Sequence, residues 1–316
     1  MAKHLSTNTL IESVVRRAML PTNQVTFKEK DFLAFANEEL DIGLIPHILS
    51  YHEDYLLQDF YTAVTPSVSR YELPYRATGN KIRDVAYLDD NGNLFEMTRI
   101  TVEDLPYYQN GSYGVSNTGV RGFYMENDTI VLVPENRHNT TGRMRITYYL
   151  RANQLVSESD ISVIRSIDRN TGIITVDKIP SKLSSPVEMD FLQLKSPHKR
   201  LEINVTPTSV DALNKTYTFN VADIPEHLVV GDHLAFAEEC IIPNIPTDLH
   251  SMLAQRIACR CLEAMNDAQG LALANQKLAE MELKTGQLID NRVEGAPMKV
   301  VNRHGFLRLS RRMLRR

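Results

Sequence analysis

The first sixty residues contain apolar positions at helical spacing in two segments. The first segment spans 9–20 and opens with Thr9, followed three residues later by Glu12, which is a capping-box pattern. We expect Pro21 to end this helix, because proline cannot continue it. The apolar face holds Leu10, Ile11, Val14, Val15 and Ala18.

The second helical segment begins at Thr26, again with a glutamate, Glu29, three residues later. It contains Pro46, which should kink or split the helix because proline lacks the amide N–H and crowds the preceding turn. The apolar positions recur at spacings of three and four. They are Phe32, Phe35, Ala36, Leu40 and Leu44, and after the proline Ile48, Tyr51, Tyr55 and Leu56.

Between residues 61 and 246 the pattern changes to short runs of β-branched and aromatic residues separated by turn signals. The runs at 121–135 and 162–180 are typical of hairpins, the second with its turn at 170–172. At least eight short strands are predicted, which indicates a mainly antiparallel β region. The segment 105–120 is rich in Gly, Asn, Ser and Tyr and predicts an exposed loop.

Helical spacing returns after Pro246. Gly270 predicts a break before a further helix that reaches about residue 288. The segment 291–297 is a linker by its Gly, Pro and Asn content. The apolar positions that recur every four residues are Leu249, Leu253, Ile257 and Cys261.

Each terminal helical block has one apolar face that must be buried, and the economical arrangement packs the two blocks on each other. The prediction is therefore an α+β fold. Residues 1–60 and 247–290 form one helical bundle, 61–246 form a large, mainly antiparallel β insertion, and 291–316 form a linker with an extended C-terminal docking arm. The predicted bundle core is Phe32, Phe35, Leu40, Leu44, Leu253 and Ile257.

The last eighteen residues carry seven Lys or Arg and no acidic residue, although the whole chain has a net charge of −4. The other 298 residues hold 28 basic and 39 acidic side chains, a net charge of −11. The basic end has three interpretations: a solvated tail, a nucleic-acid-binding segment, or an arm that docks on a protein partner. We favour the arm, because a solvated tail does not need the large apolar residues interleaved with its cations. These are Val300, Val301, Phe306, Leu307, Leu309, Met313 and Leu314.

The sequence contains few residue patterns that are typical of a catalytic or metal site. The sequence has no phosphate-binding, serine-hydrolase, zinc-protease or dinucleotide-binding motif. Cys259 and Cys261 are not spaced as a zinc pair, and buried thiols are the better interpretation. The run 89–93 lacks the closing glutamate of a calcium loop, so we interpret it as a hairpin turn. No enzymatic activity, cofactor or metal is predicted.

Two further groups of residues each allow a functional and a structural interpretation. His47, His52, Glu53 and Asp54 cluster near a helix end, where a metal or acid–base site competes with the favoured interpretation as solvated or interface residues. The aromatic loop at 105–120 has the composition of a single-strand nucleic-acid platform. No basic residue lies between Arg99 and Arg121, so a protein contact or simple exposure fits it better. The longest apolar runs are too short to span a membrane.

Three stretches together resemble a known family. They are FKEKDFLAFANEELDIGLIPHILSYHEDYLL at 27–57, IPNIPTDLHSMLAQRIACRCLEAMNDAQG at 242–270, and AEMELKTGQLIDNRVEGAPMKVVNRHGFLR at 279–308. Their content and order are similar to those of head-to-tail adaptor proteins, also called connector or neck-ring proteins, of tailed bacteriophages. The resemblance covers roughly 9–60 and 162–308, and the short-tailed phages are the favoured source.

The resemblance implies a structural virion protein of the neck, assembled in the host cytoplasm. Such adaptors form a ring, commonly of twelve copies, beneath the portal protein. They surround the DNA channel, contact passing DNA without sequence specificity, and bear downstream tail or nozzle proteins and fibres. The implied portal-docking arm includes Val300, Val301, Arg303, Phe306, Leu307, Arg308, Arg311 and Arg312. The alternative is a nucleic-acid-binding packaging or ejection-associated protein that uses the basic tail directly.

Overall fold

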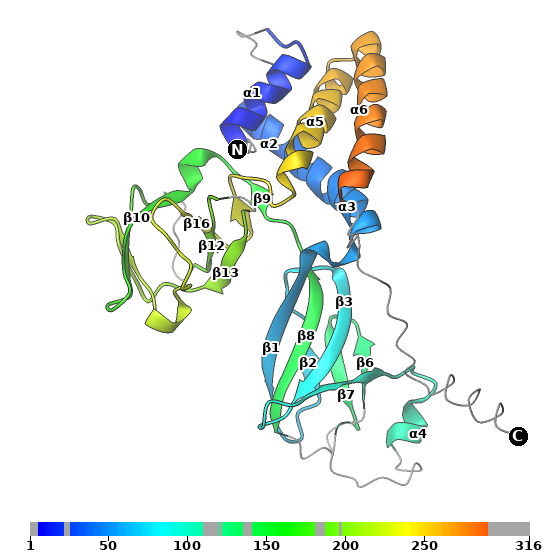
Figure 1. Ribbon diagram of the computed structural model, residues 1–316. Coiled ribbons are helices and arrows are strands. Elements are labelled where there is room, and N and C mark those ends of the chain that lie inside the picture. The colour runs from blue at the N-terminus through cyan, green and yellow to red at the C-terminus, as the bar shows by residue number, and fades with distance from the viewer. Residues whose placement is uncertain are drawn as a thin grey trace, which may run out of the picture.

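The fold is α+β, as predicted, with helices from both ends of the chain packed together and antiparallel sheets between them in sequence (Figure 1). The predicted arm lies outside the described part of the chain. The computed structural model describes residues 6–21, 26–109, 120, 122–134, 141–180, 187–195 and 198–289.

The helical bundle is organised around α5, which packs against α1, α2 and α6. Its apolar face meets those of the other helices in one continuous core. The helices are α1 (Thr7–Arg17), α2 (Glu29–Glu38), α3 (Ile45–Tyr51), α5 (His250–Ala264) and α6 (Ala268–Ile289). The terminal segments of the chain thus bury their apolar faces against each other.

The helical segment that contains Pro46 is split, as the sequence predicts. The α2 helix passes into a π-helical segment, Glu39–Leu44, and α3 then starts with the proline in its first turn. At this point the backbone bonding changes: the Ile45 N–H donates to the Leu40 carbonyl oxygen five residues back, and the missing N–H of Pro46 falls where the π-helical pattern gives way to the α-helical one.

The predicted capping boxes at the first two helices are wrong. Ser6 is the N-cap of α1, and the Thr9 hydroxyl donates to the Ser6 carbonyl oxygen at 2.9 Å. In α2 the carboxylate of Asp31 accepts from the backbone N–H of Lys28 at 2.8 Å, so the N-cap, Lys28, lies two residues beyond the predicted cap. Several polar residues near each helix start could serve as caps, and the tertiary packing selects among them.

Two helix ends also lie at other residues than predicted. The α1 helix ends before Pro21, because Met19 adopts a left-handed conformation with φ 52°. The turn between α5 and α6 is made by Asn266, with φ 58°, and Gly270 lies inside the first turns of α6. Asparagine tolerates the left-handed region better than most residues, so it supplies the turn that glycine was expected to make.

The first β unit is a sandwich of two four-stranded sheets, ordered β1-β8-β3-β4 and β2-β7-β6-β5, around a core of its own. The predicted loop at 105–120 begins with a short helix, α4 (Leu105–Gln109). The strands are β1 (Leu57–Val64), β2 (Arg70–Glu72), β3 (Ala77–Leu88), β4 (Leu94–Glu96), β5 (Thr98–Arg99), β6 (Gly122–Glu126), β7 (Thr129–Val133) and β8 (Gly142–Leu150).

The second β unit contains a seven-stranded sheet in the order β13-β12-β16-β10-β11-β15-β14, with a separate core. The parallel pair β9 (Gln154–Leu155) and β17 (Glu239–Cys240) connects it to the bundle. The other strands are β10 (Ser162–Asp168), β11 (Ile173–Val176), β12 (Met189–Leu192), β13 (Arg200–Val205), β14 (Ser209–Asp211), β15 (Thr216–Thr218) and β16 (His233–Phe236).

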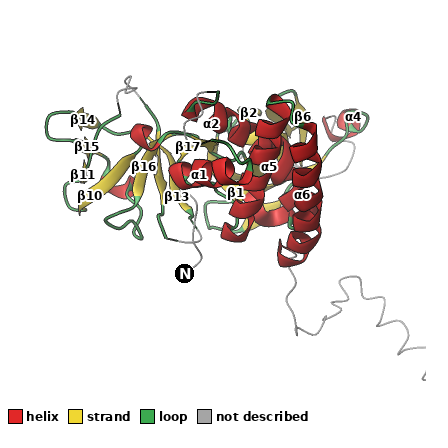
Figure 2. Ribbon diagram, turned by 90° about the horizontal axis from the view of Figure 1, so that it is seen from above, coloured by secondary structure: helices red, strands yellow, loops and turns green. Residues whose placement is uncertain are grey.

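The predicted β insertion therefore consists of two units with separate cores. Seen from above, the seven-stranded sheet lies to one side of the bundle, and α5 and α6 lie over the first unit (Figure 2). Both predicted hairpins are present, as β6–β7 and β10–β11. In the second, the Asp168 carboxylate accepts from the backbone N–H of Asn170 at 3.0 Å, and Gly172 has φ 76°.

Candidate interaction surfaces

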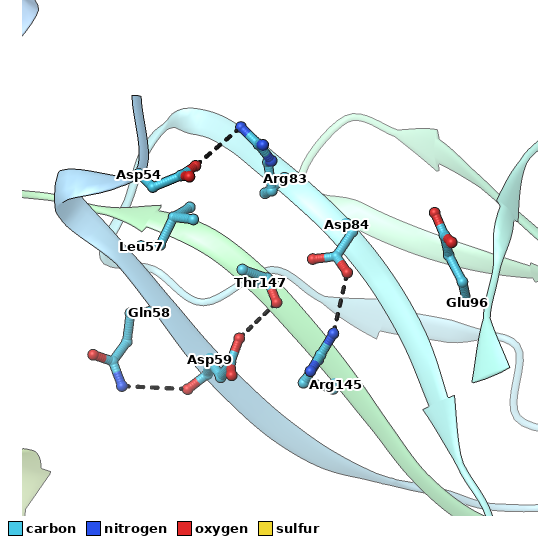
Figure 3. Close-up of a pocket in the computed structure, with 9 residues that line it drawn as sticks. All are labelled: Asp54, Leu57, Gln58, Asp59, Arg83, Asp84, Glu96, Arg145 and Thr147. Atoms are coloured by element: carbon cyan, nitrogen blue, oxygen red, sulfur yellow. Dashed lines mark hydrogen bonds and ion pairs between the residues drawn. The ribbon is translucent and has the colours of Figure 1, made fainter. Parts of the chain in front are cut away.

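A polar groove of about 760 Å³ lies on the outer face of the sheet β1-β8-β3-β4 (Figure 3). It is wide open to solvent, and its side chains come from β1, β8, β3, β4 and the 3-10 helix that precedes β1. The lining residues are Asp54, Leu57, Gln58, Asp59, Arg83, Asp84, Glu96, Arg145 and Thr147.

Arg83 organises the upper end of the groove. Its guanidinium lies 3.0 Å from the Glu53 carboxylate and 3.2 Å from that of Asp54, and it donates to the Tyr149 hydroxyl oxygen at 3.3 Å. The Tyr149 hydroxyl in turn donates to Glu53 at 3.0 Å. This hydrogen bond, followed by the attraction of Arg83, holds the pKa of Glu53 below its usual value.

The middle of the groove is also internally paired. Arg145 contacts the Asp84 carboxylate at 3.2 Å, and the Thr147 hydroxyl donates to Asp59 at 2.6 Å. No hydrogen bond or ion pair joins Glu96 to the other residues that line the groove (Figure 3). These side chains form an open polar surface, which suits contact with another macromolecule better than enclosure of a small substrate.

The two β units meet at a buried ionic joint. Arg76, which precedes β3, is 1% exposed, and Asp190 on β12 is 0% exposed. Two guanidinium nitrogens of Arg76 reach the two Asp190 oxygens at 2.8 and 2.9 Å. The same carboxylate accepts from the Asn153 amide at 3.0 Å and from the Asn204 backbone N–H at 3.1 Å. The burial of this charge pair is tolerable because both carboxylate oxygens accept hydrogen bonds, and only Nε of the Arg76 guanidinium is without a partner among the described residues.

Arg200 lies beside the joint and donates to the Arg151 carbonyl oxygen at 3.1 Å and to the Asn153 side-chain oxygen at 3.2 Å. Burial, with the positive charge of Arg76 nearby, lowers the pKa of Arg200. The connection between β8 and β9 is thus bonded to both units. We infer from these contacts that the second unit is held in a defined position relative to the first.

A second ionic cluster joins the N-terminal and C-terminal helices of the bundle. Glu39 accepts from Arg256 at 3.2 Å and from Arg260 at 2.6 Å, and Arg256 also pairs with Glu282 on α6. Glu39 is 10% exposed in its side chain, so these contacts are largely shielded from solvent. They connect the π-helical segment to α5 and α6 and fix the register of the packed helices.

The predicted bundle-core residues lie in the bundle core. Phe35 is partly buried and packs against it, and the others are buried: Phe32, Leu40, Leu44, Leu253 and Ile257. The predicted docking-arm residues all lie outside the described residues. They are Val300, Val301, Arg303, Phe306, Leu307, Arg308, Arg311 and Arg312.

The other candidate groups take structural positions. His47 packs edge-on against Tyr51 with ring centroids 5.2 Å apart, and burial lowers its pKa. Cys259 and Cys261 are buried free thiols, and burial raises the pKa of Cys261 to about 12. Within the described ranges no group of three or more His, Cys, Asp or Glu could hold a metal ion. No helix in the described part of the chain is long and apolar enough to cross a membrane.

Sequence reasoning missed the Arg76–Asp190 joint. A signal existed, because Asp190 interrupts the apolar run of β12, and an acid in such a run requires a buried partner. The partner is 114 residues away, so nothing local identifies it.

In comparisons with known proteins, no family model matches the chain, and no curated protein gives a significant match.

Proposed function

We propose that the protein is a structural subunit of the head-to-tail adaptor of a tailed bacteriophage, with short-tailed phages favoured. Copies form a ring, twelve by resemblance, that joins the portal protein to the tail and surrounds the DNA channel. No catalytic step or cofactor is part of this function. The proposal rests on the resemblance of the terminal segments to adaptor proteins.

The observation that carries the proposal is the assembly of both terminal segments into one bundle. The adaptor-like stretches at 27–57 and 242–270 are far apart in sequence, yet α2 and α5 pack together, and the Glu39 ionic cluster joins the π-helical segment after α2 to α5. The α6 helix ends at Ile289, at the end of the bundle that faces the first β unit (Figure 1). The linker and the basic segment follow from this end, where an arm can leave without disturbing the bundle core.

The charge distribution supports the same function. Residues 1–298 carry a net charge of −11, and the seven cations of the tail are concentrated in 299–316. An acidic body around a channel repels phosphate and lets DNA slide, because non-specific DNA binding grows with the number of cation contacts. The apolar residues of the arm supply portal contacts. The β units lie to the outside and offer a surface for tail or nozzle proteins and fibres.

A truncation tests the docking arm. Deletion of 299–316 should leave the bundle folded, because the described core lies entirely before residue 290, and should abolish binding to purified portal protein. Circular dichroism checks the fold and sedimentation with portal measures binding. A matched variant with Arg311, Arg312, Arg315 and Arg316 changed to glutamine keeps the apolar residues and should retain portal binding in part. Unchanged affinity after the deletion contradicts the docking role.

The seven cations also favour a second candidate, a packaging or ejection-associated protein that binds nucleic acid through the tail. On that function the intact chain binds DNA with a steep salt dependence, and the slope of log affinity against log salt decreases by about 0.9 per lost phosphate contact. The same four-arginine variant then loses DNA binding, while portal binding is not required.

A further inference from the structure

The strand β1 is a long sheet edge. It pairs with β8 along all eight of its residues, from Leu57 to Val64, and the sheet order leaves its other side at the edge. Figure 1 shows β1 along one side of the first unit. The strand contains no proline, lysine or bulge, which usually protect an edge from pairing, and its one charged residue, Asp59, is hydrogen-bonded to Thr147 of the neighbouring strand.

The other edges of the large sheets differ from β1. In the described part of the chain, β2, β4, β5 and β14 have only three, three, two and three residues. The six-residue strand β13 has register shifts against β12 and carries Arg200 and Glu202. These edges are short, irregular or charged. Among the edges of those sheets that the structure describes, β1 alone is both long and regular.

The two edges of the β1-β8-β3-β4 sheet expose large apolar side chains. On β1, Phe60 is 40% exposed and Tyr61 is 51% exposed. On β4, at the opposite edge, Leu94 is 47% exposed and Phe95 is 53% exposed. Neighbouring apolar side chains at both edges of one sheet suggest a contact surface.

These four side chains are distributed equally over the two faces of the sheet. Phe60 pairs with Ile146, which is fully buried, so the phenylalanine lies on the face toward the core. By strand alternation and the registers of β3 and β4, Phe95 shares that face, while Tyr61 and Leu94 lie on the outer face. Each edge therefore presents one large apolar side chain to each face.

The strand directions allow the two edges to join. Each adjacent pair in β1-β8-β3-β4 is antiparallel, so β4 runs opposite to β1. A β4 strand placed beside the β1 strand of another copy continues the antiparallel sheet. The contact uses different surfaces on the two copies, so its repetition closes a ring or extends a filament.

We propose that β4 of one copy pairs with β1 of the next, so that these sheets continue from subunit to subunit. This inference rests on the proposed ring and names one of its contacts. Pairing covers Phe60 and Tyr61 on one copy with Phe95 and Leu94 on its neighbour.

The contact is small. The three residues of β4 limit it to a few backbone hydrogen bonds and four large side chains. This is less than the roughly 1,000 Å² that a stable interface needs. Free copies therefore associate weakly through it, and the ring forms when other contacts or a template hold the copies together.

A disulfide between the edges tests the pairing on the full-length chain. The variant carries Tyr61→Cys and Leu94→Cys. Three strand spacings of about 4.8 Å separate β1 from β4 within one chain, well beyond the reach of a disulfide. The native cysteines, Cys240, Cys259 and Cys261, are buried. Oxidation of concentrated protein should give a ladder of dimers, trimers and larger species on a non-reducing gel, at least several-fold above the controls.

The controls separate this contact from random collision. Each single variant measures like-with-like pairing, and a Leu94→Cys, Leu213→Cys variant uses Leu213, which is 94% exposed, in place of the β1 position. A ladder no stronger than that of this control overturns the proposal. Efficient dimers from Tyr61→Cys alone also overturn it, because they indicate β1–β1 pairing.

A blocking substitution provides the second test. Phe60→Lys, added to the double-cysteine variant, places a charge at the core-facing edge and should reduce the ladder about tenfold, while Leu213→Lys should not. Thermal unfolding followed by circular dichroism checks that both variants fold. Portal-bound rings without a cross-linked ladder disprove this pairing and leave the adaptor function standing. A ladder from a protein that forms no ring on portal supports the pairing and contradicts the adaptor function.

Discussion

Arg76 and Arg83 lie close together in sequence, and each pairs with carboxylates, yet burial gives them different roles. Arg76 is 1% exposed and faces Asp190 across the joint between the two β units. Arg83 is 41% exposed and divides its guanidinium between Glu53 and Asp54 at the edge of an open groove. The buried pair cannot lose one member without leaving an uncompensated charge, whereas water can replace either member of the exposed pair.

The Glu39 cluster in the bundle is intermediate between these two. Its glutamate is 10% exposed and its arginines are 15% and 35% exposed. If burial decides the contribution of each arginine–carboxylate contact, the loss of stability on substitution should decrease from the joint to the bundle and then to the groove.

The largest effect is expected for Arg76→Ala. It leaves the Asp190 carboxylate buried without its guanidinium, a loss of about 3–5 kcal/mol in the free energy of unfolding. Urea unfolding followed by circular dichroism measures it, since the chain has no tryptophan. The control is Arg76→Met with Asp190→Leu, which removes both charges and should restore part of the stability, because the Asn153 amide and the Asn204 N–H then lose their acceptor. A loss below about 1 kcal/mol for Arg76→Ala contradicts the account of the joint.

Glu39→Gln should have a smaller effect, a loss of about 1–3 kcal/mol, because it weakens charge-assisted hydrogen bonds from Arg256 and Arg260. Glu263→Gln is the matched comparison. Glu263 lies 3.5 Å from Arg260 but is 62% exposed, so its loss should stay within about 0.5 kcal/mol. If urea unfolding gives the same loss of unfolding free energy for both variants, burial does not decide how much each contact contributes.

His233 provides a further test of how burial affects a charge, because its side chain becomes charged when the pH falls. Burial lowers the pKa of this histidine below 6.5. The unfolded chain therefore binds the proton more readily, so the stability that His233 contributes is complete above pH 6.5 and is lost as the pH falls towards the folded-state pKa.

The melting temperature should therefore decrease between about pH 7.5 and about pH 5.5. In His233→Gln the decrease should be smaller. The pKa of His47 is also lowered, so part of the decrease persists in this variant. If the melting temperature of His233→Gln depends on pH in the same way as that of the unsubstituted protein, His233 does not contribute to the pH dependence of stability.

The smallest effect is expected for Arg83→Ala, a loss of stability smaller than that of Glu39→Gln, which diminishes as salt is added. Urea unfolding at low and high salt measures it. A loss as large as that of Arg76→Ala, or one that salt does not reduce, shows that the groove is a rigid structural element.

The sequence predicted the helices better than their ends. The four-residue repeat through Leu253 and Ile257 reflects the packing of α5 in the core, which spans many residues and is hard to mistake. Helix ends depend on single polar residues, and the choice of Ser6 over Thr9 is made by surroundings that no local pattern contains.

The sequence could not predict that the β region consists of two units, for a related reason. Strand alternation shows that a residue is buried, but not in which core. Ile146 and Ile164 have similar patterns, yet they belong to separate units. The groove and the joint depend on pairings between distant residues, such as Arg145 with Asp84 and Arg76 with Asp190, and these need the fold to be known first.

The central claim is that the protein forms an adaptor ring on the portal. Negative-stain imaging of the purified full-length protein mixed with portal protein tests it most directly. The account predicts a second ring stacked coaxially on one face of each portal, and its absence when residues 299–316 are deleted. Portals that remain bare at saturating concentrations of the intact protein would contradict the claim.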